Sequence, residues 1–336
     1  MSCLLNTPHI AVVGAGIAGL SCAAQLENLG MRVSVFDKSR GTGGRMSTRR
    51  GDDWQADHGA QYFTARHPLF MAELERWQRA GVAGLWQTTV AVLGEGSPHR
   101  RDNTPSRYVG IPRMSSPARW LANELGMTTS ARVTELSRHE HRWQLRFDET
   151  TPAHEALEKT RYDAVVLAIP SAQAASLTQA HCNRMTALCE ASDMLPCWAA
   201  MLSFSTPVPL PFDAAFVNAG PLRWIARDNS KPGRPDSETW VLHASTSWSG
   251  QHLEDSTDAV MDALTQAFTA LGGPAPVSVT AHRWRYSEPV SSPQPEVCAW
   301  DAALKLGLCG DWLNGGRVEG AWLSGHALAR NIASME

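Results

Sequence analysis

Short apolar runs bounded by glycine and acidic residues divide the start of the chain into a strand, a helix and a second strand. Ile10 to Val13 is a continuous apolar run, which is typical of a buried parallel strand. Ile17 and Leu20 then recur at helical spacing until Gly30, a residue type that commonly ends a helix. Arg32 to Phe36 alternates apolar and polar positions as strands do. The order predicts a βαβ unit.

The same reading extends over two further groups of elements. In the first group we expect strands at 60–64, 88–93, 131–136, 142–147, 162–170 and 303–309, helices at 68–80, 116–126 and 320–332, a helix from Ser171, and a loop at 105–112. In the second group strands are expected at 197–204, 214–217, 222–226, 238–245 and 277–286, with one amphipathic helix at 255–271. The second group predicts a mostly antiparallel sheet that roofs a ligand site.

Composition narrows the class of protein. The chain has 336 residues, of which 43% are hydrophobic and 19% charged, and this length suffices for two domains. The net charge of -3 gives no electrostatic reason to expect a nucleic acid or an anionic membrane as partner. No apolar run approaches the about 18–20 residues of a membrane span, and the first residues lack a secretory signal pattern. Seven scattered cysteines without a C-x-x-C pair favour a reducing, cytoplasmic setting and no metal site.

Three glycines between the first strand and the first helix carry the first chemical prediction. Gly14, Gly16 and Gly19 have G-x-G-x-x-G spacing. The first permits a tight turn, the second lets a pyrophosphate approach the backbone, and the third lets helix and strand pack closely. The helix N-terminus offers free N–H groups to that pyrophosphate, and Asp37 is placed to bind a ribose. The motif predicts a dinucleotide without distinguishing FAD from NAD.

A glycine-rich basic loop follows Asp37. Gly41, Gly43 and Gly44 alternate there with several arginines, among them Arg45. Such a loop is either a second anion-binding nest beside the first one or a flexible solvated segment. Its position directly after the ribose-binding acid favours the anion-binding interpretation.

The motifs I-A-V-V-G-A-G-I-A-G-L, V-F-D-K-S-R-G-T-G-G-R-M-S-T-R-R and D-H-G-A-Q-Y-F-T together resemble the flavin amine oxidase superfamily, and within it the renalase branch of bacterial type. The resemblance implies an α/β fold, α+β overall. A Rossmann-like FAD-binding domain is expected at 1–75, 105–178 and 297–336. An interleaved, mostly antiparallel substrate domain is expected at 76–104 and 179–296, as in the two-domain folds of p-hydroxybenzoate hydroxylase and amine oxidases.

The resemblance also implies non-covalent FAD. In related flavoproteins Asp311 matches a contact to the ribityl–phosphate segment, and 318–320 lie beside the pyrimidine edge of the flavin, where a helix N-terminus stabilises negative charge. The alternative for this C-terminal stretch is a plain surface turn. The expected FAD contacts are Gly14, Gly16, Ile17, Ala18, Gly19, Asp37, Lys38, Gly44, Arg45, His58, Gly59, Ala60, Gln61, Val133, Ala168, Pro170, Gly310, Asp311, Val318, Glu319, Gly320 and Ala321.

The chain has no second G-x-G-x-x-G, so either the reductant is an organic substrate or a nicotinamide enters the substrate pocket. Renalases oxidise dihydronicotinamide dinucleotides reduced at the wrong ring position, the 2-dihydro and 6-dihydro isomers of NAD(P)H, to NAD(P)+. The resemblance implies this reaction here, with dioxygen re-oxidising the flavin to give hydrogen peroxide. An amine oxidase or desaturase on the same fold remains an alternative, as does a non-catalytic flavin-binding redox sensor.

Five residues are candidates for the catalytic pocket. Gln61 and Tyr62 follow the Asp57–Gly59 turn, Trp284 and Tyr286 lie in an aromatic stretch, and His243 lies on a strand of the roof. His243 either hydrogen-bonds a substrate carboxamide or is a structural histidine. A basic edge formed by Arg223, Arg227, Asn229 and Lys231 is either a phosphate contact or a solvated loop. Six tryptophans in or just beyond this part (Trp198, Trp224, Trp240, Trp248, Trp284, Trp300) either pack a core or form flat walls for a planar ligand.

Overall fold

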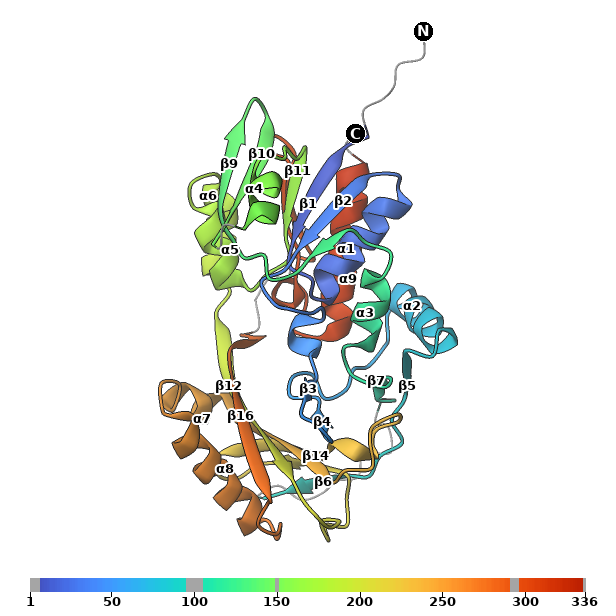
Figure 1. The fold of residues 1–336 in the computed structure, drawn as a ribbon, viewed down its shortest axis with the longest axis vertical. Helices are drawn as coiled ribbons and strands as arrows, with labels where there is room; N and C mark the ends of the chain where they lie inside the picture. The colour runs from blue at the N-terminus through green and yellow to red at the C-terminus, as the bar shows by residue number, and fades with distance from the viewer. Residues whose placement is uncertain (1–6, 95–104, 149–150, 291–295, 335–336) are drawn as a thin grey trace.

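Two six-stranded sheets organise the molecule, one in each of two lobes. The structure, a computed structural model, describes residues 7–94, 105–148, 151–290 and 296–334. The long strands β12 (Met194–Ser203) and β16 (Ser278–Pro289) extend from the lower lobe toward the upper one (Figure 1). The expected fold class, a Rossmann-like domain with a mostly antiparallel second domain, is confirmed.

The sheet of the upper lobe has a parallel centre. In pairing order its strands are β17 (Ala299–Asp301), β18 (Leu306–Leu308), β11 (Ala164–Leu167), β1 (His9–Val13), β2 (Arg32–Phe36) and β8 (Met127–Thr128). Strand β1 lies between β11 and β2, so that Ile10 is opposite Ala164 on one side and Val33 on the other. Only β17 runs antiparallel to its neighbour. The continuous apolar runs of the sequence therefore become strands buried on both faces.

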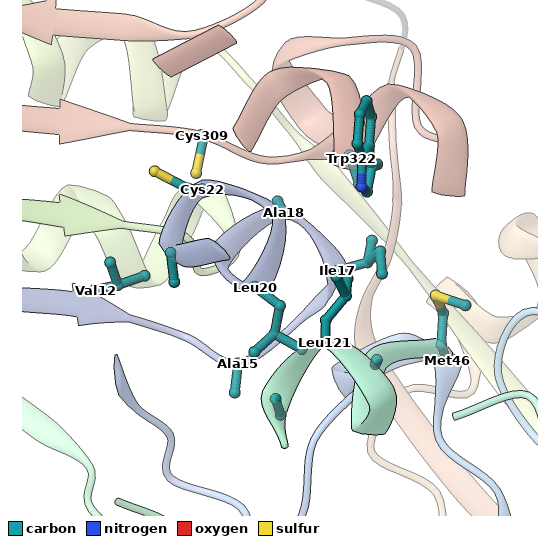
Figure 2. Close-up of a cluster of buried hydrophobic side chains, with 14 of the residues drawn as sticks. Val12, Ala15, Ile17, Ala18, Leu20, Cys22, Met46, Leu121, Cys309 and Trp322 are labelled. Atoms are coloured by element: carbon teal, nitrogen blue, oxygen red, sulfur yellow. The ribbon is translucent and has the colours of Figure 1, made fainter. Parts of the chain in front are cut away.

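Helices from the two ends of the chain pack against each other beside this sheet (Figure 1). They are α1 (Ile17–Asn28) and α9 (Val318–Ala333). A Cβ at Gly325 would lie 1.9 Å from the Ala18 carbonyl oxygen, so the two backbones approach closely because this residue is glycine. Figure 2 shows Ala18 and Cys22 of α1 in one buried cluster with Cys309 and Trp322. Both chain ends thus build one domain.

The remaining elements of the upper lobe and its margin are short. They are η1 (Gly44–Met46), β3 (Arg49–Arg50), β4 (Gln55–Ala56), α2 (Pro68–Arg79), β5 (Ala83–Leu85), β7 (Tyr108–Gly110), α3 (Ser116–Ala122), β9 (Val133–His139), β10 (Arg142–Phe147), α4 (Pro152–Glu158), α5 (Ser171–Thr178), α6 (Asn183–Glu190) and η3 (Asp311–Leu313). Strands β9 and β10 form the expected hairpin, a separate two-stranded sheet.

The sheet of the lower lobe has the order β16, β12, β15 (Thr239–Ala244), β14 (Leu222–Arg227), β13 (Ala214–Val217), β6 (Val90–Leu93). All neighbours are antiparallel except β13 and β6. Helices α7 (Thr246–Gln251) and α8 (Thr257–Ala270) lie beside it (Figure 1), and η2 (Asp228–Ser230) follows β14. Leu264 and Phe268 of α8 share a core cluster with Trp198 and Trp240, which are therefore packing residues.

Several local predictions were wrong. Residues 60–64 form no strand: Phe63 makes an isolated bridge to Tyr108, which lies in β7 within the expected loop 105–112. Helix α3 begins after Ser115 and ends at Ala122, four residues earlier than expected. The pairing of Phe63 with Tyr108 joins segments far apart in the chain, which a local pattern does not encode. Residues 95–104 of the expected substrate domain lie outside the described residues.

Two expected domain boundaries cut through packed units. The boundary at 75/76 falls inside α2, where Trp77 packs with Phe70 in the cluster around α1. The boundary at 178/179 falls before α6, whose Met185 and Cys189 pack with the strands of the upper sheet. We propose that the FAD-binding domain includes all of α2 and α6. Along the described part of the chain, no helix is both long and apolar enough to cross a membrane.

Candidate active site

A cavity of about 1750 Å³ lies where the two lobes meet. It exceeds the about 300–1,000 Å³ of an ordinary small-molecule pocket. All five expected catalytic residues line it, and so do all expected FAD contacts except Gly19 and Gly320. Those two glycines serve packing, since a Cβ at Gly19 would lie 1.9 Å from the Gly14 carbonyl oxygen and one at Gly320 would lie 1.8 Å from that of Asn314.

The first glycine turn leaves room for a ligand at one position only. Gly14 has a φ of +109°, and a Cβ there would lie 2.4 Å from the Ala168 carbonyl oxygen. A Cβ on Gly16, by contrast, would find nothing within 4 Å. Gly16 also caps α1, so its open side faces free N–H groups at a helix N-terminus. This arrangement suits a pyrophosphate.

The basic glycine loop lies directly beside that turn. The Gly43 N–H donates to the Ala15 carbonyl at 2.9 Å, and both carboxylate oxygens of Asp37 are held, one by Ala15 N–H and one by Ser39 N–H, each at 2.7 Å. Gly43 and the following glycine both have positive φ, which opens the loop. Thr42 belongs to the residues that line the cavity, and its Oγ1 is buried without a hydrogen-bond partner in the described structure. The loop therefore offers an unused polar group to a ligand.

Arg45 and Asp311, expected as separate FAD contacts, form an ion pair with each other. The guanidinium donates two hydrogen bonds to the carboxylate, at 2.9 and 2.5 Å, and a third to the Ser287 carbonyl at 3.1 Å. Asp311 follows the C-terminal strand β18, whereas Ser287 lies on β16 of the lower lobe. The pair ties the two ends of the chain and the second sheet together at the cavity wall.

Helix α9 begins at Val318, two residues before the expected start. The carboxylate of Glu319 accepts hydrogen bonds from the N–H groups of Arg66 and His67, at 2.7 and 2.6 Å. Glu319 thereby fixes the segment that leads into α2. What the first turn of α9 can offer a cofactor is its backbone N–H groups and positive dipole end.

The His58 turn is held by the second sheet. Its carbonyl accepts hydrogen bonds from Trp284 Nε1 at 2.9 Å and from His243 Nε2 at 3.1 Å, and its ring stacks on Trp284 with centroids 5.1 Å apart. Burial lowers the pKa of His58 to about 3 and that of His243 to about 4, so both rings are neutral at pH 7. His243 therefore makes a structural contact, while it also lines the cavity. Nδ1 of His58 is buried with no partner among the residues described.

The side chains of Gln61 and Tyr62 differ in how firmly they are held. The Gln61 amide nitrogen donates to the Asp57 and Gly59 carbonyls, and its oxygen accepts from Lys231 Nζ at 3.4 Å, so its side chain is fixed. Tyr62 is half-buried, and its ring lies 5.6 Å from that of Trp224. Tyr62 is thus the more available of the two for a substrate. Tyr286 lies farther along β16 and lines the cavity.

A buried ionic cluster beside Gln61 escaped the sequence analysis. It consists of Asp57, Asp228, Lys231 and Arg234, whose side chains are 0–1% exposed. Lys231 Nζ lies 2.7 Å from Asp228 and 3.2 Å from Asp57, and Arg234 donates to Asp57 at 2.5 Å. The only hint of this cluster in the sequence is the charged residues of the loop after β14, and such residues are equally typical of a solvated loop.

Neither interpretation of the basic edge, a phosphate contact or a solvated loop, fits these contacts. Lys231 is buried in that cluster. Arg227 donates to Glu238 at 2.6 Å, and Arg223 forms a bidentate pair with Glu288 at 2.6 and 2.8 Å. Of these basic residues only Arg223 lines the cavity. Paired charges compensate their own burial and leave little capacity for a phosphate.

The matched family agrees with this site. Residues 12–77 match the NAD(P)-binding Rossmann-like domain, and residues 83–333, most of the chain, match the flavin containing amine oxidoreductases. The chain belongs to the flavin-containing amine oxidoreductase family. FAD is its cofactor, and the open face of Gly16 with the unpartnered Thr42 and His58 groups fits such a ligand.

Individual relatives show the fold and a short common stretch. A putative protoporphyrinogen oxidase from Exiguobacterium sp. 255-15 superposes with a TM-score of 0.79 at 13% identity, covering 98% of this chain and 100% of that one. Cyclohexylamine oxidase from Brevibacterium oxydans IH-35A gives 0.74 at 12% identity, over 98% and 99%. L-amino acid oxidase Cdc18 from Crotalus durissus cumanensis is 42% identical over 64 residues, 19% of this chain. That stretch spans only 13% of the snake protein's length.

Proposed function

We propose that this flavoenzyme oxidises mis-reduced dihydronicotinamide dinucleotides, the 2-dihydro and 6-dihydro isomers of NAD(P)H, to NAD(P)+. Bound FAD supplies the hydride acceptor, and dioxygen re-oxidises it with formation of hydrogen peroxide. The chain's own task is to hold the donor ring in place and exclude water. Loss of hydride leaves an aromatic pyridinium, so no substrate proton has to be removed. The strongly lowered pKa values of His58 and His243 are compatible with a reaction that needs no general base.

The charge balance of the cavity wall carries this proposal. Cationic side chains outnumber carboxylates among the lining residues even when the four arginines paired with carboxylates (Arg45, Arg223, Arg283 and Arg285) are left out. The remaining cations are Lys38, Arg40, Arg50, Arg66, Arg107, Arg113, Arg119, Arg132 and Arg317, and the lining carboxylates are Asp37, Glu288, Asp311 and Glu319. Each of these four carboxylates already accepts hydrogen bonds from this chain. Such a wall attracts a ligand with phosphates and leaves no lining carboxylate for a substrate ammonium.

Oxidation of an amine or amino acid is the second candidate. Similarity to cyclohexylamine oxidase and to an L-amino acid oxidase favours it. An α-amino acid would also place a carboxylate against the cationic wall. A simple alkylamine fits less well, because it brings a positive charge without a free counter-ion in the cavity.

Anaerobic mixing of the oxidised holoprotein with candidate reductants tests the proposal. The substrates are the 2-dihydro and 6-dihydro isomers, ordinary NADH, cyclohexylamine and L-leucine, and the measurement is loss of visible flavin absorbance. We expect rapid bleaching by the isomers, and one hydrogen peroxide per substrate once oxygen is admitted. Bleaching by amines or L-leucine alone would contradict the proposal in favour of the second candidate. A flavin that no donor reduces would point to a redox sensor.

A further inference from the structure

Arg107 is a cavity-lining arginine that lacks an ionic partner in the described ranges. Its carbonyl accepts from Trp86 N–H at 2.8 Å, which fixes the backbone next to β7. The guanidinium carbon lies 5.1 Å from the centre of the Tyr62 ring. Nε is buried with no hydrogen-bond acceptor within the described structure. Arg45 and Arg223, which line the same cavity, are by contrast both paired with carboxylates.

Trp224, whose ring also lies close to that of Tyr62, provides a second unused donor. The residue is 5% exposed, and its indole N–H has no acceptor in the described part of the chain. Its ring centre lies 5.6 Å from Tyr62 and 4.8 Å from Phe216, a cavity-lining phenylalanine that is 38% exposed. Two donor side chains therefore lie close to one half-buried aromatic ring at the cavity wall.

Buried donors without acceptors are costly, and a charged one costs most. A ligand oxyanion removes this cost, because its oxygens accept from a guanidinium fork and from an indole N–H. Glu288, a carboxylate that lines the same cavity, is already held by both terminal nitrogens of Arg223. No acceptor for these two donors therefore lies among the described residues, and a bound ligand can supply it.

We propose that Arg107, Trp224 and the Tyr62 ring, to which both lie close, form a subsite for a phosphate of the substrate. This inference rests on the proposed function and deepens it, because it assigns the recognition of the dinucleotide's phosphates to particular residues. Phosphate is favoured over carboxylate because the surrounding wall carries several further cations and its carboxylates are engaged. The subsite binds a part of the substrate that does not react, so it governs KM more than kcat.

A comparison of substrates with and without phosphate tests the subsite. The substrates are the 2-dihydro isomers of NAD, of nicotinamide mononucleotide and of nicotinamide riboside, which has no phosphate. Arg107→Met should lower kcat/KM by about 10- to 100-fold for the first two, through KM, and leave the riboside within about twofold. Arg107→Lys should recover part of the loss, since it restores the charge without the fork. Trp224→Phe keeps a ring and removes only the donor, so a smaller loss is expected.

Arg138→Met is the matched control. Arg138 also lies over an aromatic ring, with its guanidinium carbon 5.8 Å from the centre of Trp143, and its Nε likewise has no acceptor among the described residues, but it does not line the cavity. This variant should leave all three substrates unaffected. The unfolding temperature and flavin content of each variant separate misfolding from lost recognition.

A binding measurement separates the subsite from the reaction. ADP titrated into oxidised holoprotein, followed through the visible flavin spectrum, should bind about 10- to 100-fold more weakly to Arg107→Met; L-leucine in the same titration tests a carboxylate as the ligand. Equal losses for riboside and dinucleotide, or unchanged ADP affinity, overturn the subsite. A tight L-leucine site lost in Arg107→Met also overturns it. Wild-type protein inactive on every dihydronicotinamide overturns the proposed function instead, and ADP affinity then decides the subsite alone.

Discussion

Replacing Lys231 by methionine should be among the most destabilising single substitutions in this chain. The change keeps an unbranched side chain of similar length and removes only the charge. Lys231 is the ammonium that lies between Asp57 and Asp228, at 3.2 and 2.7 Å. Its removal leaves two buried carboxylates facing one guanidinium, that of Arg234.

The loss of stability depends on the contacts that the Asp228 carboxylate keeps once Lys231 is replaced. One carboxylate oxygen keeps a hydrogen bond from the Asp57 N–H at 3.2 Å, whereas the other has no hydrogen bond within the described ranges and only Arg234 Nε at 3.8 Å. Burial raises the pKa of Asp228, which already shows how poorly the site tolerates its charge. Breaking a fully buried pair in this way costs about 3–5 kcal/mol, a factor of about 100 or more in the folding equilibrium. The double variant Lys231→Met/Asp228→Asn restores the charge balance and should cost less than about 2 kcal/mol.

Equilibrium urea unfolding of the holoprotein measures both variants, with tryptophan fluorescence for the fold and flavin fluorescence for FAD release. Lys159→Met, at the exposed C-terminal end of α4, is the control and should be neutral. Because Asp57 precedes the His58–Gly59 turn, FAD release should accompany unfolding at lower urea in Lys231→Met. A loss below about 1 kcal/mol, or a double variant at least as unstable as the single one, would refute the argument from uncompensated charge.

Two further predictions concern the glycine turn and pH. Gly16→Ala should keep wild-type stability but bind FAD more weakly, because its Cβ fills only ligand space, whereas Gly19→Ala, with a Cβ 1.9 Å from a carbonyl oxygen, should lose about 1–3 kcal/mol of stability. Titration of the apoprotein with FAD compares the affinities of the two variants, and thermal melts compare their stabilities. Equal stability of the two variants would contradict the packing role of Gly19. Lowering the pH from 6.5 toward 4 should destabilise the fold, because the unfolded chain protonates His58 and His243 while the folded pKa values are about 3 and about 4. Each histidine contributes about 2 kcal/mol of this loss at pH 5. Urea titrations at pH 8 and 5 measure it, and His243→Asn should reduce the dependence of the unfolding free energy on pH.

The elements that could be predicted from the sequence are those whose signal is local. Gly14 is required by its positive φ and Gly19 by its contact with the Gly14 carbonyl, both within one βαβ unit, so their spacing predicts the turn. The β9–β10 hairpin follows from alternation within two adjacent runs. The bridge between Phe63 and Tyr108 depends on how two distant segments meet, and the local patterns predict a strand at 60–64 and a loop at 105–112 instead. Secondary structure that exists only through such a contact is invisible to a periodicity argument.

The candidate site divides in the same way. Its backbone parts, such as the open face of Gly16, follow from motif spacing, whereas its charges depend on their partners. Lys231 and Asp57 are 174 positions apart, and a lysine between a serine and a proline is normally solvated. Arg107 and Arg223 look equivalent in the sequence and both line the cavity, yet Arg223 is neutralised by Glu288 whereas Arg107 has no ionic partner in the described part of the chain. The state of a charge is set by tertiary contacts and had to come from the structure.

The segment that begins at Asp57 couples cofactor and substrate. Asp57 is held by the cluster from the lower lobe, and the carbonyl of His58 by donors from β15 and β16. A Cβ on Gly59 would lie 2.0 Å from the carbonyl oxygen of Arg45, so this segment also packs closely against the basic loop beside the dinucleotide turn. Tyr62, at its end, carries the proposed phosphate subsite. A change in the lower lobe that moves His58 should therefore move the Arg45 backbone too, and we expect substitutions within this segment to change substrate recognition and FAD affinity together.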